Sequence, residues 1–233
     1  MSIAKLEAKP SPWTEFVRGL ARERALLVLF ERGRSQGLTL RLARVVAFGV
    51  FTSYALAIVF TRGADRGASV RSCVHAALLT LSWGVGAPVA LSAARFLAEP
   101  SGSDPLAALA LGRGYARHSL FRARVLSVAL RVARPVALFG VSLVGIGLAR
   151  GATAIWALSA APAVLVYASA LGLVLALLAL LAAELAPRRP RALLVYLVLA
   201  LLLVARAFPS FPSPLAALSW LLDELLDSGA ALT

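Results

Sequence analysis

Long apolar runs separated by short arginine-rich connectors are the feature that most limits how this chain folds. About five such runs occur, and charged residues rarely interrupt them as they interrupt the helices of a water-soluble protein. A mean hydropathy of +0.84, with 60% hydrophobic residues over 233 positions, leaves too few polar side chains to cover a soluble surface. Because about 20 apolar residues cross a bilayer as a helix, the pattern predicts an all-α, polytopic membrane bundle of five to six membrane segments.

The charged and reactive residues of the chain exclude several classes of protein. The net charge of +13 does not indicate a nucleic-acid partner, because the arginines stand at the ends of apolar runs. We expect membrane lipids as the partners of this charge. With a single cysteine, two histidines and scattered acids, we expect no catalytic, cofactor or metal site. Both lysines, Lys5 and Lys9, lie near the N-terminus, so ATP hydrolysis would belong to a partner subunit.

Residues 1–44 form a polar leader that contains one amphipathic helix. Ser11 and Pro12 resemble an N-cap and a first helical position, which predicts a helix over 12–33. Trp13 and Phe16 fall on its apolar side and are interpreted as anchors at the membrane interface. We therefore expect this helix to lie in the headgroup layer on the cytoplasmic side.

A transmembrane domain is expected over residues 45–207. Its second span carries glycines and a proline that favour close packing or a kink. Its fourth span is longer than one crossing requires, so we expect it to tilt, to kink near Pro162 or to protrude. The last run is short enough to be either spanning or re-entrant. The expected spans are 45–61, 74–94, a third that follows connector 95–124 and ends near Ala149, 154–186 and 192–205. Residues 208–233 are expected to form an interfacial or re-entrant tail on the outer side of the membrane.

The distribution of Arg and Lys predicts the orientation. Nine lie in residues 1–44, seven in 95–134 and three in 187–191, against three, one and one in the connectors of the opposite side. By the positive-inside rule, the N-terminus and connector 95–124 are cytoplasmic. We expect a multi-pass protein of a bacterial inner (plasma) membrane.

Four arginines form a stripe at the start of the third span. Arg117, Arg124, Arg131 and Arg134 recur at spacings of seven, seven and three, which places them along one side of a helix. The stripe either anchors the helix to anionic headgroups or docks an acidic partner or a lipid phosphate.

The order of segments resembles that of ABC-2 type transporter permeases, the CcmB-like group included. An amphipathic leader, two spans, a helical cytoplasmic connector and three further segments follow each other in both. The connector matches loosely: Gly114 stands where the family often has proline, and Arg113 where it often has serine or threonine. The residues that carry the resemblance are Leu106, Leu109, Leu111, Gly112, Gly114, Arg117, Leu120, Phe121, Ala123 and Arg124.

The resemblance implies the permease subunit of an ATP-driven exporter. The connector would act as a coupling helix that contacts a separate ABC ATPase subunit. Two permease copies, as a homodimer or a related pair, would line the pathway. The family's sixth span has no counterpart here, although 208–226 resembles the re-entrant segment that precedes it. The alternative is a non-transporting membrane scaffold or anchor subunit of a larger complex. The implied coupling residues are Leu106, Leu109, Gly112, Gly114, Arg117, Leu120 and Arg124.

The predicted orientation can be tested at Tyr115. In a Cys73→Ser background, Tyr115→Cys should resist a membrane-impermeant maleimide applied outside intact cells, because connector 95–124 is expected to face the cytoplasm. Ser69→Cys, on the opposite connector, should be labelled under the same conditions. Labelling of residue 115 from outside would invert the orientation.

Overall fold

The fold is known from a computed structural model that describes residues 24–28, 38–61, 66–98 and 105–207, with Leu218, Trp220 and Glu224. Within these ranges the regular structure is helical throughout, with no strand. Four helices are long and apolar enough to cross a membrane: Arg41–Phe60, Gly67–Ala98, Arg117–Ala149 and Ala154–Leu185. The expectation of a multi-pass helical membrane protein is confirmed to this extent.

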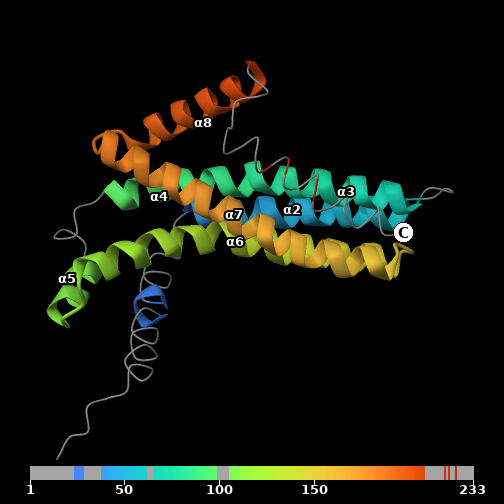
Figure 1. Ribbon diagram of the computed structural model, residues 1–233, viewed down its shortest axis with the longest axis horizontal. Helices are drawn as coiled ribbons and strands as arrows, with labels where there is room; N and C mark the ends of the chain where they lie inside the picture. Colours follow the sequence, from blue (N-terminus) through green and yellow to red (C-terminus); the bar gives the residue numbers. More distant parts are fainter. Residues whose placement is uncertain are drawn as a thin grey trace, which may run out of the picture.

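The elements run back and forth along one axis, with α8 crossing obliquely (Figure 1). A short helical turn at 24–28 comes first, and its preceding residues, including Trp13 and Phe16, lie outside the described residues. The bounds are α2 Leu38–Phe60, α3 Arg66–Leu81, the π-helical turn η1 Ser82–Gly86, α4 Ala87–Ala98, α5 Pro105–Gly112, α6 Arg117–Ala149, α7 Ala154–Leu185 and α8 Pro190–Ala207.

Two of the observed helices differ from their predicted bounds, and a third, α7, agrees with them to within one residue. The first begins at Leu38 instead of near Val45, so it includes the arginines expected to flank it. The second span is continuous from Arg66 to Ala98, longer than the predicted 74–94. Gly84 and Gly86 lie in its π-helical turn, and the expected close packing is found there, since an added Cβ would lie 3.3 Å from Val46 and 3.0 Å from Leu175, respectively. Helix α7 continues as one α-helix through Pro162, which leaves tilt or protrusion to account for its length. Of the predicted tail, Leu218, Trp220 and Glu224 are described, and each is helical.

The π-helical turn carries a buried polar pair. The Ser82 hydroxyl donates to the Leu78 carbonyl at 2.7 Å and lies 2.8 Å from the Tyr167 hydroxyl. Because the single proton of Ser82 is already donated, Tyr167 is the donor of the second bond. Both hydroxyls are thereby satisfied inside an apolar bundle, where an unmade hydrogen bond is costly.

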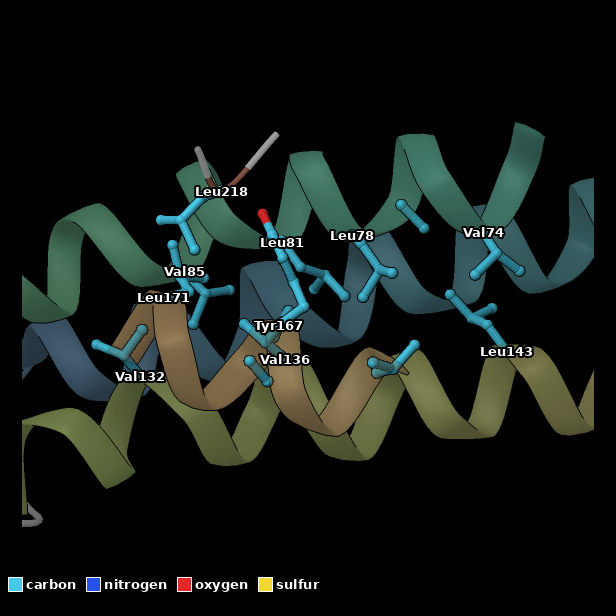
Figure 2. Close-up of a cluster of buried hydrophobic side chains, with 14 of the residues drawn as sticks. Val74, Leu78, Leu81, Val85, Val132, Val136, Leu143, Tyr167, Leu171 and Leu218 are labelled. Atoms are coloured by element: carbon cyan, nitrogen blue, oxygen red, sulfur yellow. The ribbon is translucent and has the colours of Figure 1, made fainter. Parts of the chain in front are cut away.

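The main core forms where α3, α6 and α7 meet. Its side chains point toward one another from the three helices, and Leu218 of the tail packs on the same cluster (Figure 2). Among the members shown are Val74, Leu78, Leu81, Val132, Val136, Leu143, Tyr167 and Leu171.

Two glycines allow α6 and α7 to approach each other closely. A Cβ at Gly172 would lie 2.4 Å from the backbone oxygen of Ala129. A Cβ at Gly140 would lie 2.6 Å from Val164 Cγ1 and 2.7 Å from Leu78 Cδ2. By contrast, nothing lies within 4 Å of a Cβ placed at Gly145, which also belongs to α6. The contact of α6 with α7 therefore depends on particular glycines.

Gly172→Ala should destabilise the protein by about 1–3 kcal/mol, because the new methyl meets backbone that cannot move aside without separating α6 from α7. Gly145→Ala is the matched control and should be neutral or stabilising by up to about 1 kcal/mol. Reversible unfolding in mixed dodecyl maltoside and SDS micelles measures both. Equal effects of the two substitutions would contradict this account of the packing.

Candidate functional site

The bundle has two ends, the turn end and the connector end, which differ in charge and in how far their helices extend. The turn end comprises residue 61, the start of α3 and the α6–α7 turn at Arg150–Thr153, where the Arg150 Nη2 donates to the Val59 carbonyl. The connector end comprises the end of α4, α5 and the start of α6, together with the end of α7 (Figure 1). Because the helices are aligned at the turn end, any difference in their length emerges at the connector end.

Helices α6 and α7 are too long for a bilayer. They have 33 and 32 residues, or about 50 Å, against about 30 Å of hydrocarbon. A tilt of about 20° shortens them by about 3 Å only. If the turn end lies at one edge of the hydrocarbon, counting about 20 residues from Arg150 places the opposite edge near Arg131. On this placement the remaining residues would extend about 20 Å beyond that edge. We call this part the stalk and define it as α4, α5, residues 117–130 of α6 and 172–185 of α7.

Helix α5 ends in a tight reversal at Gly114. The Tyr115 amide donates to the Ala110 carbonyl and the Gly114 amide to the Leu111 carbonyl, at 3.2 and 2.9 Å. This is the Schellman pattern, and Gly114 takes the left-handed conformation that it requires, with φ +79°. A proline at this position would have neither the φ nor the amide donor. The segment predicted as one helical connector is therefore two helices, α5 and the start of α6.

The stalk has a small core of its own, which receives the inner face of α5. Ala110 of α5 is buried against Leu26, so the described part of the leader packs on the stalk. On the opposite face of α5, Leu109 is 47% exposed. The buried members of this core are Leu26, Ala93, Phe96, Ala110, Leu120, Ala123, Val128, Ala129 and Ala176.

Six of the seven predicted coupling residues fall into two groups according to their exposure. Leu109, Gly112, Gly114 and Arg117 are exposed at the connector end. Leu120 and Arg124 are 1% and 5% exposed, so neither is accessible to a partner on this surface. Leu106 lies in α5.

The arginine stripe occupies one helix, as predicted, but its members differ in environment. Arg117 and Arg134 are exposed, Arg131 is half-buried, and Arg124 is buried with its guanidinium carbon 5.3 Å from the centroid of the Phe96 ring. The Ser127 hydroxyl donates to the Arg124 carbonyl at 2.7 Å. Arg124 therefore joins α6 to α4 through a cation–π contact and does not serve as a headgroup anchor.

Further exposed residues lie beside the predicted coupling residues but were not included among them. Arg113, Phe121 and Arg122 are exposed at the corner between α5 and α6. On α7, three leucines at spacings of four form an apolar stripe along the stalk: Leu177, Leu181 and Leu185, which are 49%, 44% and 65% exposed. The stripe was hidden because α7 is apolar on all sides. These leucines lie on the part of α7 that belongs to the stalk, whereas the lipid-facing leucines of α7 lie on the part assigned to the membrane.

The exposed charge of the stalk is mostly positive. Glu184 is the one acid of the stalk, against the exposed Arg95, Arg117 and Arg122, so the excess of positive charge favours an acidic or phosphate-bearing partner. Within the described ranges, no three His, Cys, Asp or Glu side chains gather as a metal ion would require. Comparison with protein families, curated proteins and solved structures finds no match for this chain.

Arg124→Gln should destabilise the folded protein by about 1–2 kcal/mol, because it removes the contact with Phe96 and the packing of the buried side chain. Arg122→Gln removes the same charge from an exposed position and should change stability by less than about 0.5 kcal/mol. Unfolding in mixed micelles measures the difference, and equal stabilities would argue against a structural role for Arg124.

Proposed function

We propose that this chain is the membrane-spanning permease subunit of an exporter driven by a separate ATP-binding-cassette ATPase. The observation that supports the proposal is the length of α6 and α7, 33 and 32 residues. On the placement above, this length carries the stalk past the membrane level, where its exposed apolar side chains would meet water. Leu109 on α5 and the stripe of Leu177, Leu181 and Leu185 on α7 are of this kind. Exposed apolar surface of this sort favours a protein partner.

The position of α5 would allow it to transmit a movement of the ATPase to the membrane helices. It follows the second spanning helix, and it is fixed to α6 by the reversal at Gly114. A push on the exposed face of α5 would therefore reach α6 directly, and through the contact at Gly172 it would reach α7. Rigid-body displacement of packed helices is a common way to couple a partner's change of shape to a membrane domain.

A single copy of the bundle is tightly packed and apolar inside. Among the described residues, the buried polar side chains are Ser82, Arg124 and Ser127. Ser82 is satisfied by Leu78 and Tyr167, so it lines no water-filled path. In this proposal the transport pathway lies between two copies of the chain or between a related pair, and the N-terminus is cytoplasmic.

The same packed interior favours the second candidate, a non-transporting scaffold. Such a subunit needs docking surface and membrane anchorage but no conduit. The stalk supplies the first and the four long helices supply the second. The two candidates differ in the identity of the protein that covers α5.

A photo-crosslinking residue in place of Leu109 should capture a polypeptide that carries a Walker A motif when it is activated in the host's own membranes. The reason is that the exposed face of α5 would lie in the ATPase interface. The same residue at Leu158, which is 77% exposed at the turn end, should capture lipid and no ATPase. Peptide sequencing of the adducts gives the result. Capture at Leu109 of a protein without a nucleotide-binding motif would reject the permease and support the scaffold.

A further inference from the structure

Helix α8 leaves the bundle at an angle and opens a groove beside α4. Among the described elements it touches α4 and α7, and its far end diverges from both (Figure 1). The groove has a volume of about 400 Å³. Its lining residues are Pro88, Leu91, Ser92, Arg191, Ala192 and Val195.

The groove lies at the depth of lipid headgroups. A Cβ at Gly86 would lie 3.0 Å from Leu175, 3.4 Å from Val132 and 3.9 Å from Leu171, which places Gly86 close to the level of Arg131, taken above as the hydrocarbon edge. Pro88, Leu91 and Ser92 follow within two turns, about 3–9 Å further toward the connector end. Headgroups occupy a layer of about 5–7 Å on each side of the hydrocarbon. The opening between α4 and α8 therefore faces the polar layer of the membrane and the ends of the acyl chains.

Arg191 is the charged side chain among the described residues that line the groove. Arg188 and Arg189 are exposed in the preceding turn. The six lining residues include no acid. A guanidinium matches a phosphate with two parallel hydrogen bonds. Since none of the described lining residues is a carboxylate that could pair with the amine of a zwitterionic headgroup, the groove favours a headgroup with net negative charge.

The apolar part of the groove continues along α8 into the hydrocarbon. Val195 borders the groove, and Leu199, one turn further, is 50% exposed on the same side of the helix. Because α8 runs away from the connector end, Arg191 lies at the headgroup level and Leu199 lies deeper. An acyl chain that descends from a phosphate at Arg191 would follow this stripe.

We propose that the groove between α4 and α8 is a binding site for one anionic phospholipid, with its phosphate on Arg191 and an acyl chain along Val195 and Leu199. Basic pockets between membrane helices on one side of the bilayer are suited to such headgroups. The site is independent of the proposed exporter function, since it requires neither an ATPase nor a second copy.

Lipid retention by the purified full-length protein tests the site. Native mass spectrometry from micelles doped with phosphatidylglycerol should show one tightly retained lipid, and phosphatidylcholine at the same concentration should not. Arg191→Gln should weaken retention roughly fivefold, which corresponds to one arginine near a headgroup. Arg188→Gln, which removes the same charge outside the groove, should retain the lipid as the wild type does. Equal retention by both variants would show general surface attraction and overturn the site.

A second pair of variants tests the shape of the groove without changing charge. Ala192→Phe fills the groove and should lower retention of phosphatidylglycerol, whereas Ala200→Phe, at an exposed position of the same helix, should not. Unchanged retention in Ala192→Phe would overturn the placement. Inorganic phosphate alone should not raise the unfolding temperature in micelles. A rise that Arg191→Gln abolishes would show a free-phosphate site and reject the lipid.

Discussion

The close approach of α6 to α7 fixes the level of every other feature in the bundle. Inside lipid the hydrophobic effect does not hold helices together, because acyl chains are as apolar as leucine, so association depends on packing that small residues allow. Gly172 meets the backbone of Ala129, and Gly140 meets Val164. These contacts hold the two helices antiparallel in one register. In that register Arg117, Arg122 and Arg124 of α6 lie beside residues 172–185 of α7, and these segments form part of the stalk.

Much of this fold follows from the sequence, because the apolar runs and their arginine flanks determine which segments cross a membrane. The turn at Arg150 and Gly151 also follows, and Gly151 has the positive φ, +101°, that such a turn favours. The sequence does not determine the rotation of each helix about its axis, that is, which side of the helix faces the core. Helix α7 is apolar all round, so nothing in its pattern tells that Leu171 is 4% exposed and Leu165 is 50% exposed. The neighbouring helices decide that, and they are distant in sequence.

The candidate site, too, can be predicted from the sequence only in part. Spacing along one helix correctly places Arg117 and Arg124 on α6. It does not show that Phe96 of α4 covers the second arginine and leaves the first exposed. The break at Gly114 was readable in principle, since glycine after a leucine-rich helical segment is a common C-terminal signal. The prediction of one helical connector, which followed the family resemblance, did not include this break. The exposed leucines of α7 become visible only when helix length is compared with membrane thickness.

The stalk and the lipid groove are connected through two helices. Helix α8 contacts α4 and α7, and the ends of these same helices form part of the stalk. A displacement of the stalk would therefore change the spacing between α4 and α8, on which the width of the groove depends. A lipid that fills the groove favours one spacing, and by reciprocity it favours the stalk position that accompanies it. The two proposals nevertheless stand apart, because lipid retention is measured without a partner and crosslinking at Leu109 does not involve the groove. If both hold, the anionic lipid would set the resting position from which a partner moves the stalk.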